Sequence, residues 1–146
     1  MSFFLSHSTG ETEEFAAKWG AKLKPGSVIL LAGPLGAGKT AFVRGFFTGL
    51  GGDPNYLVTS PTFTLQNIYP TKKGPLHHLD LYRLGNYREF REAGLEETLD
   101  GKGFAVIEWG DKFAELQSSC SSFIRIEIIG EKIRKIKISP PVDNLK

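Results

Sequence analysis

The sequence predicts an α/β fold in which a mixed parallel and antiparallel sheet is flanked by helices. Two short apolar runs, 28–32 and 104–107, are typical of strands buried on both faces. Apolar residues recur with the helical period at 12–23 and 39–50. Extended segments bounded by turn residues occupy 62–69, 76–84, 123–129 and 133–138. This combination of strands and helices predicts three layers, with helices on both faces of the sheet. The sheet itself is predicted to be mixed rather than purely parallel.

The composition indicates one globular domain spanning residues 1–146. The 18 basic and 16 acidic residues leave a net charge of +2, which is too small for an electrostatic nucleic-acid footprint. The single cysteine, Cys120, excludes an internal disulfide and fits a reducing compartment. Because no apolar run approaches the roughly 18 residues of a membrane helix, we expect a cytoplasmic protein without membrane contact.

The first half of the chain reads as helix, strand, turn and helix. The first helix is predicted over 12–23, with Thr9 as its N-cap and Phe15, Ala16, Trp19 and Leu23 on its inner face. Residues 24–26 break that pattern and the buried strand 28–32 follows. The second helix, 39–50, ends at Gly51, so a glycine-rich turn joins a buried strand to a helix.

The second half contains two expected hairpins. The segments 62–69 and 76–84 are predicted to pair antiparallel around the exposed connection 70–75. A short polar helix at 86–93 should end at Gly94, and the strand 104–107 should lead into a helix at 111–116. The last two segments, 123–129 and 133–138, are joined by a turn at 130–132.

The turn at 33–40, GPLGAGKT, matches the phosphate-binding pattern G-x-x-x-x-G-K-[ST] and lies between a strand and a helix, as that motif requires. Backbone N–H groups and the helix N-terminus can surround phosphates where side chains are small. Lys39 would reach the β- and γ-phosphates, and the Thr40 hydroxyl would bind Mg²⁺. The motif therefore predicts a P-loop NTPase-like fold that binds ATP and Mg²⁺, rather than a chance glycine-rich turn.

Two carboxylates compete for a second magnesium contact. Glu108 follows the buried run 104–107, and Asp80 follows the extended run 75–79. Both lie where strands end, which is where ligands of open α/β sheets bind; the alternative for each is a surface ion pair, for example with Arg83. His77 and His78 are interpreted as polar strand residues, because no cysteine or second histidine cluster supports a transition-metal site.

Four linked motifs resemble the TsaE family, formerly YjeE. They are GPLGAGKT at 33–40, SPTFTLQNIY at 60–69, HLDLYRL at 78–84 and IEWGDK at 107–112. The resemblance implies the P-loop ATPase of bacterial tRNA threonylcarbamoyladenosine (t6A) synthesis, which modifies adenosine 37 together with the TsaB and TsaD subunits. It implies contact with tRNA only through that complex. Because Arg44 and Arg83 have solvated or structural interpretations and no other residue clearly supplies an arginine finger, we expect slow Mg²⁺-dependent hydrolysis by the isolated chain.

The resemblance also assigns site residues. It makes Lys39 the phosphate-binding lysine, Thr40 and Glu108 the magnesium ligands, and Asp80 a residue needed for hydrolysis. Ser60, Pro61 and Thr62 match a switch-like segment near the γ-phosphate, with Thr62 among the catalytic candidates. The remaining nucleotide-binding residues are Gly33, Leu35, Gly36, Ala37, Gly38 and Ala41 in the loop, Trp109 beside it, and Thr9, Glu11 and Thr12 at the base and ribose. SPTFT as a simple turn and Trp109 as a core residue stay open as alternatives.

One departure and two rival functions complete the prediction. The family usually has aspartate where this chain has Pro34, which removes an N–H and should stiffen the loop entrance. We expect ATP and Mg²⁺ to order 60–69 and favour docking on TsaB and TsaD. The alternatives are a small-molecule kinase, which needs an acceptor pocket and lid, and a non-hydrolysing nucleotide-dependent binding module.

Overall fold

The computed structural model describes residues 2–139; residue 1 and residues 140–146 of the predicted domain lie outside the described part. Seven strands form one sheet in the order β1-β7-β6-β2-β5-β4-β3. Their bounds are β1 Ser2–Ser6, β2 Val28–Ala32, β3 Gln66–Tyr69, β4 Leu76–Asp80, β5 Phe104–Glu108, β6 Ser122–Ile128 and β7 Arg134–Ser139. Parallel and antiparallel pairs occur in the same sheet, so the predicted mixed α/β fold is confirmed.

The central strand β2 is buried along its whole length. It pairs in parallel with β5 on one side and with β6 on the other, so that Leu30 lies opposite both Ile107 and Phe123. Strands covered on both faces read as continuous apolar runs. The two buried runs of the sequence are therefore the middle of the sheet.

The outer strands are antiparallel. The pairs β3–β4 and β6–β7 confirm the two predicted hairpins, but 62–65 and 81–84, predicted as extended, form turns outside the strands of the first hairpin. Strand β1, which pairs with β7, was not predicted. Its apolar residues Phe3, Phe4 and Leu5 are consecutive, so the sequence lacks the alternation of apolar and polar residues that is typical of a half-buried strand. Only the distant partner β7 makes it a strand.

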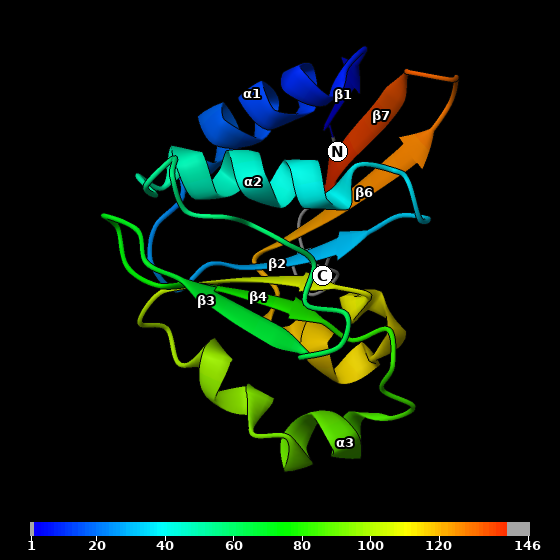
Figure 1. Ribbon diagram of the computed structural model, residues 1–146. Helices are drawn as coiled ribbons and strands as arrows, with labels where there is room; N and C mark the ends of the chain where they lie inside the picture. The colour runs from blue at the N-terminus through cyan, green and yellow to red at the C-terminus, as the bar shows by residue number, and fades with distance from the viewer. Residues whose placement is uncertain (1, 140–146) are drawn as a thin grey trace.

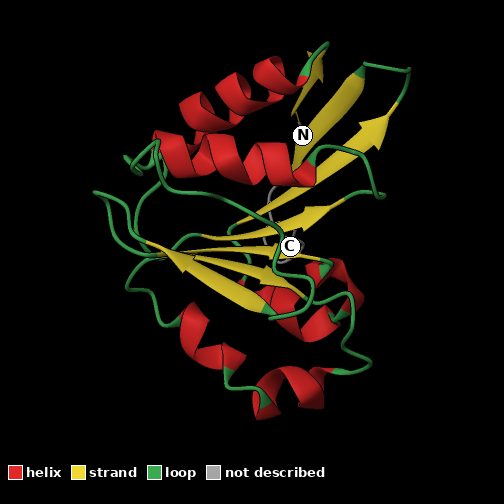
Figure 2. Cartoon of the chain, viewed as in Figure 1, coloured by secondary structure: helices red, strands yellow, loops and turns green. Residues whose placement is uncertain are grey.

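Helices cover both faces of the sheet (Figures 1 and 2). Helices α1 (Thr9–Gly20) and α2 (Lys39–Gly49) lie side by side on one face, and α3 (Tyr87–Glu92) lies on the other with the 3-10 helices η1 (Leu95–Leu99), η2 (Gly110–Lys112) and η3 (Ala114–Ser119). A Cβ added at Gly45 or Gly49 of α2 would collide with the backbone of α1 at Glu13 and Ala17. These two glycines let the helices pack closely.

Two helix predictions need correction. The first helix begins three residues earlier than predicted, and its N-cap is Ser8 rather than Thr9, because the Ser8 side chain accepts the Glu11 N–H at 3.1 Å. Its C-terminal end tightens into i+3 turns at Lys22 and Leu23. The helix predicted at 111–116 is two short 3-10 helices instead. The short helix after Asn86 is confirmed, with a capping box to Glu89.

No helix within residues 2–139 has the length and apolar character needed to cross a bilayer.

Candidate functional site

The loop between β2 and α2 has the backbone of a phosphate cradle. Gly33, Gly36 and Gly38 have φ values of 155°, 79° and 101°, which side chains rarely adopt. A Cβ at Gly33 would lie 2.7 Å from the carbonyl oxygen of Ile126 on the neighbouring strand β6. Pro34 is exposed, and its carbonyl accepts the Ala37 N–H at 3.1 Å. The missing N–H of Pro34 thus lies at the entrance of the loop, before the glycines that open α2.

Lys39 lies across the mouth of this loop. Its side chain is only 7% exposed, and Nζ donates to the Gly33 carbonyl at 2.8 Å. The ammonium is 4.0 Å from Glu108 Oε1 and 4.2 Å from the centre of the Trp109 ring. Burial lowers the pKa of Lys39, against the opposing effect of Glu108 and of more distant carboxylates. A buried ammonium with one carboxylate at the edge of contact is suited to receive further negative charge.

The two competing carboxylates converge. Asp80 and Glu108 are register partners at the ends of the parallel strands β4 and β5, and each is 3% exposed. Glu108 Oε2 lies 2.6 Å from Nε2 of His78. Asp80 Oδ1 accepts the Tyr82 N–H at 2.9 Å. Neither carboxylate is the exposed surface ion pair that was the alternative for both.

The segment 60–62 contacts Asp80 directly. Ser60 Oγ and Thr62 Oγ1 lie 3.2 and 3.1 Å from Asp80 Oδ2, and each can donate its proton to it. The turn is closed by a hydrogen bond of 2.9 Å from the Leu65 N–H to the Pro61 carbonyl, with Leu65 at φ 70°. The segment 60–64 is a turn that leads into strand β3, as the alternative interpretation predicted. Its Ser60 and Thr62 hydroxyls also contact Asp80.

Trp109 adopts the left-handed backbone conformation, with φ 63°, which is uncommon for a bulky residue. Its ring packs on Lys39 and lies 5.3 Å from the Tyr82 ring. Its side chain is half-buried rather than part of the closed core. Strained backbone of this kind clusters at functional sites.

These residues surround a cavity of about 560 Å³, which we call the acid-side cavity. Its lining consists of Leu35, Gly36, Gly38, Lys39, Thr40, Ser60, Thr62, Asp80, Tyr82, Glu108 and Trp109. All but Tyr82 were singled out from the sequence. The structure thus brings together the phosphate loop, both acids and the 60–62 segment.

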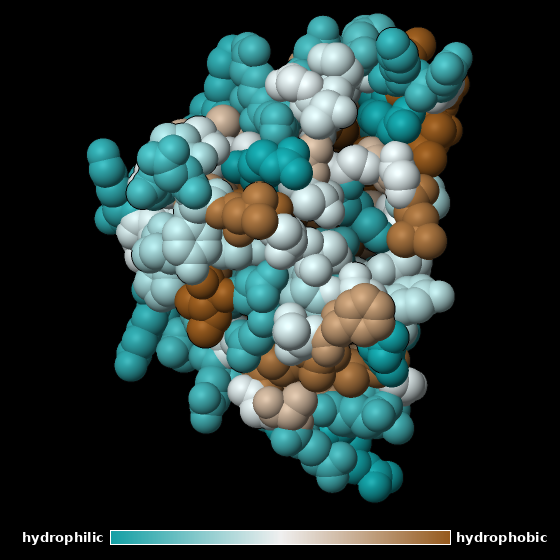
Figure 3. All heavy atoms as spheres, viewed as in Figure 1, coloured by the Kyte–Doolittle hydropathy of each residue, from teal (hydrophilic) through white to brown (hydrophobic). Residues whose placement is uncertain are grey.

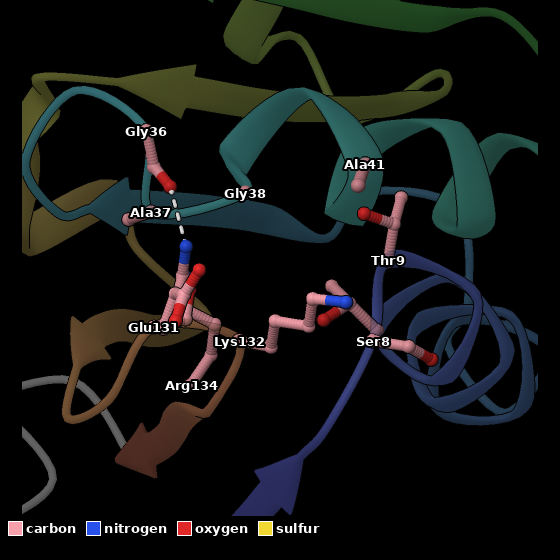
Figure 4. A pocket seen from close by; sticks show the side chains of 10 residues that line it. Ser8, Thr9, Gly36, Ala37, Gly38, Ala41, Glu131, Lys132 and Arg134 are labelled. Carbon is pink, nitrogen blue, oxygen red and sulfur yellow. Dashed lines mark hydrogen bonds between the residues drawn. The ribbon is translucent and has the colours of Figure 1, made fainter.

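A second cavity of about 370 Å³, the hairpin-side cavity, opens on the other side of the loop (Figure 4). Its lining consists of Ser8, Thr9, Thr12, Gly36, Ala37, Gly38, Ala41, Glu131, Lys132 and Arg134. Arg134 donates to the Gly36 carbonyl at 3.2 Å, which ties the β6–β7 turn to the phosphate loop. In Figure 4 the Lys132 side chain extends across the cavity towards Ser8. The sequence analysis did not identify Glu131, Lys132 or Arg134 as site residues.

The predicted nucleoside residues divide between two environments. Thr9 and Thr12 line the hairpin-side cavity, and the Thr12 hydroxyl is held 2.7 Å from Ser6 Oγ. Glu11 lines neither cavity. It accepts the His7 backbone N–H at 2.8 Å, which is the main reason that the pKa of Glu11 is lowered. A nucleoside contact by Glu11 stays a prediction.

The donor groups fit Mg²⁺ shared with phosphates better than a metal held by protein alone. Residues 2–139 contain no cluster of three or more His, Cys, Asp or Glu side chains that could hold a metal. The acid-side cavity instead offers the Thr40 hydroxyl and the Glu108 carboxylate beside the loop. Mg²⁺ prefers such oxygen ligands and takes the rest of its coordination from phosphates and water.

A buried strand, a glycine-rich cradle, a lysine across its mouth and acids at the neighbouring strand ends define a protein of the P-loop NTPase-like α/β class. The chain belongs to one family of that class: residues 6–137 match the family described as "Threonylcarbamoyl adenosine biosynthesis protein TsaE". The family resemblance of the four motifs is thereby confirmed.

Named relatives and a solved structure agree with this assignment. The TsaE protein of Treponema pallidum is 36% identical over 135 residues, which is 92% of this chain and 98% of that protein. TsaE of Bacillus subtilis is 39% identical over 126 residues, covering 86% of this chain and 77% of that protein. The crystal structure of YdiB from Bacillus subtilis superposes with a TM-score of 0.76 at 30% identity, covering 98% of this chain and 87% of that one.

Proposed function

We propose that this protein is the ATP-binding and ATP-hydrolysing component of the machinery that makes t6A at position 37 of tRNA, and that it acts by cycling a complex of TsaB and TsaD. The observation that carries the proposal is the convergence of Lys39, Asp80 and Glu108 on the phosphate loop in a member of the TsaE family. ATP and Mg²⁺ are its proposed ligands.

Each group at the loop has a proposed role in nucleotide binding. The backbone N–H groups at the start of α2 bind the phosphates, and Lys39 adds a positive charge at the β- and γ-phosphates. Thr40 and Glu108 hold Mg²⁺, which when bound neutralises charge on the phosphate oxygens. Thr9 and Thr12 contact the nucleoside in the hairpin-side cavity. Trp109 keeps the Lys39 side chain across the loop.

Asp80 is the residue we assign to hydrolysis. It orients a water for attack on the γ-phosphorus, and the Ser60 and Thr62 hydroxyls hold the carboxylate in position. No arginine lines the acid-side cavity among the described residues. Phosphoryl transfer without an arginine to neutralise developing charge is slow. We therefore propose that the isolated chain hydrolyses ATP slowly and that its partners accelerate the reaction.

The rim of the acid-side cavity suits a protein partner. Leu35, Phe63 and Tyr82 are 82%, 80% and 56% exposed, and two of them line the cavity itself. On the face shown in Figure 3, exposed hydrophobic side chains form several separate groups rather than one continuous surface. Because exposed apolar groups beside a site often mark an interface, we propose that TsaB and TsaD cover this rim. A net charge of +2 supports contact with tRNA only through them.

The test is a pull-down of TsaB and TsaD with this protein, with and without ATP, combined with measurement of phosphate release. Nucleotide-dependent capture and faster release of inorganic phosphate in the complex are expected. Rapid hydrolysis that the partners do not change would contradict the coupling. A phosphorylated acceptor would indicate the kinase, and capture that persists unchanged in Asp80→Ala would indicate a non-hydrolysing module.

A further inference from the structure

A series of hydrogen-bonded polar groups runs from the buried Glu108 to the carbonyl of Thr59, the residue before the 60–62 segment. His78 Nε2 lies 2.6 Å from Glu108 Oε2, and its Nδ1 lies 3.1 Å from the Tyr69 hydroxyl. That hydroxyl is 2.9 Å from the carbonyl oxygen of Thr59. Asn67 Nδ2 donates to the same carbonyl at 3.1 Å. Of these groups, the proposed function uses only Glu108.

Three side chains of this series are enclosed by the core. His78, Tyr69 and Glu108 are 0%, 2% and 3% exposed. The Tyr69 ring packs edge-on against Phe47 at 5.6 Å and near Tyr56 at 5.8 Å, so its hydroxyl has a fixed position. Burial raises the pKa of Tyr69, so the phenol keeps its proton at neutral pH. Polar groups this deep are costly unless they are hydrogen-bonded, and each of them is.

The geometry gives the two oxygens of Glu108 different tasks. Oε2 is bound to His78, while Oε1 lies on the side of Lys39, 4.0 Å from its ammonium. A carboxylate fixed at one oxygen presents the other in a single orientation. Partners of this kind orient ligands and tune metal sites, and removing them typically lowers metal affinity by 10–100-fold.

We propose that His78 and Tyr69 are positioning residues that aim Glu108 Oε1 at the metal and link that carboxylate to the backbone entering the 60–62 segment. This inference rests on the proposed function, since it concerns Mg²⁺ bound with nucleotide. Its rival is a purely structural role, in which His78 only fills the core and partners a buried carboxylate. The positioning role predicts that substitution of His78 changes nucleotide affinity only when Mg²⁺ is present. The structural role predicts no such dependence on Mg²⁺.

The first experiment measures binding of a fluorescent ADP analogue, with Mg²⁺ and with a chelator, to the full chain. For His78→Asn, whose shorter side chain cannot reach Glu108, we expect the Mg²⁺ dependence to weaken by about 10-fold or more while binding in chelator is unchanged. His78→Gln can still present an amide donor and should recover part of the effect. His77→Gln on the same strand is the matched control, because successive strand residues face opposite ways.

The second experiment tests the link to Thr59. Tyr69→Phe removes the hydroxyl and keeps the ring, so we expect a smaller loss of Mg²⁺ dependence and faster amide exchange at 59–62 by mass spectrometry. Tyr56→Phe is the control in the same aromatic group, since the Tyr56 hydroxyl forms no hydrogen bond to a group within residues 2–139.

The outcomes separate the two proposals. If the wild-type chain binds nucleotide in neither condition, the proposed function fails. If it binds Mg²⁺ and nucleotide while folded His78→Asn and Tyr69→Phe keep the wild-type Mg²⁺ dependence and exchange, the inference is overturned. If His78→Asn does not fold, the test rests on His78→Gln and Tyr69→Phe. Wild-type Mg²⁺ dependence and amide exchange in Tyr69→Phe then overturn the inference, and a selective loss of Mg²⁺ dependence supports it.

Discussion

The two cavities share the phosphate loop but differ in how their walls are held. In the acid-side cavity, Asp80 and Glu108 lie at the ends of the parallel strands β4 and β5 and are almost completely buried. In the hairpin-side cavity, Glu131 and Lys132 project exposed from a turn, and Arg134 makes one hydrogen bond to the loop. Rigid elements position the groups assigned to chemistry, whereas the charged groups beside the proposed nucleoside site come from a turn and the first residue of the strand after it.

This difference predicts a gradient of effects. A substitution of a buried side chain in the acid-side cavity should leave a buried partner unsatisfied, which costs more than the loss of one exposed hydrogen bond. A substitution at the β6–β7 turn should be softened by water and by movement of its neighbours. Three substitutions test this gradient in nucleotide binding and hydrolysis, and a fourth, at Glu11 outside both cavities, should have the smallest effect.

The largest effect is expected for Lys39→Ala. It removes a buried charge from the loop, and we expect nucleotide affinity to fall about 100-fold, equivalent to roughly 3 kcal/mol of charge-assisted hydrogen bonding. Isothermal titration with ATP and Mg²⁺ measures this. Lys18→Ala, which only loses an exposed ion pair with Glu14, should bind as the wild type does. Retained affinity in Lys39→Ala would remove the basis of the comparison.

Asp80→Asn should separate hydrolysis from binding. The amide can still accept the Tyr82 N–H but loses the charge that orients water. We expect phosphate release in the presence of TsaB and TsaD to fall about 100-fold, while nucleotide affinity changes by less than about 3-fold. Steady-state release and titration on the same preparation test both values. An equal fall in affinity would assign Asp80 to binding.

Arg134→Ala probes the hairpin-side cavity. The substitution removes the hydrogen bond to the Gly36 carbonyl and those to the carbonyls of Gly130, Glu131 and Ile133 in the β6–β7 turn. It should weaken nucleotide binding by about 3- to 10-fold, because water can replace the guanidinium at this half-buried position. Titration with ATP and with GTP shows whether the turn also affects base preference. Lys135→Ala, on the next residue of β7 but outside the cavity, is the control. A loss as large as that of Lys39→Ala would abolish the gradient.

The smallest effect is expected for Glu11→Gln. The His7 N–H stabilises the Glu11 carboxylate and lowers its pKa from the ordinary value, so the unfolded chain binds more protons than the folded chain between the two pKa values. The resulting stability is present above the unfolded pKa and is lost as the pH falls through the lowered native value. Glu11→Gln should therefore remove a slight acid-dependent fall in melting temperature, measured by circular dichroism. A changed nucleotide affinity would instead place Glu11 at the nucleoside.

Much of the acid-side cavity could be predicted because its parts are encoded locally. The glycines and lysine of the loop lie within one motif, and Asp80 and Glu108 each end a predicted strand. The charged residues of the hairpin-side cavity could not be predicted, since Arg134 meets Gly36 only because β6 takes its place beside β2, and the two residues are 98 positions apart. Strand β1 was missed for the same reason. His78 was interpreted as an ordinary strand residue because its partner lies on a different strand.

The position of β2 also has a consequence for biosynthesis. Its Val28 N–H bonds to Ser121, 93 residues further along, and β6 follows directly after. A nascent chain emerging from the ribosome therefore carries the most apolar strand of the protein with one edge open until β6 has been made. Open apolar strand edges invite association with other chains. Truncation before Ser122 should give a product that chaperones retain or that aggregates, even though the entire phosphate loop has already been synthesised.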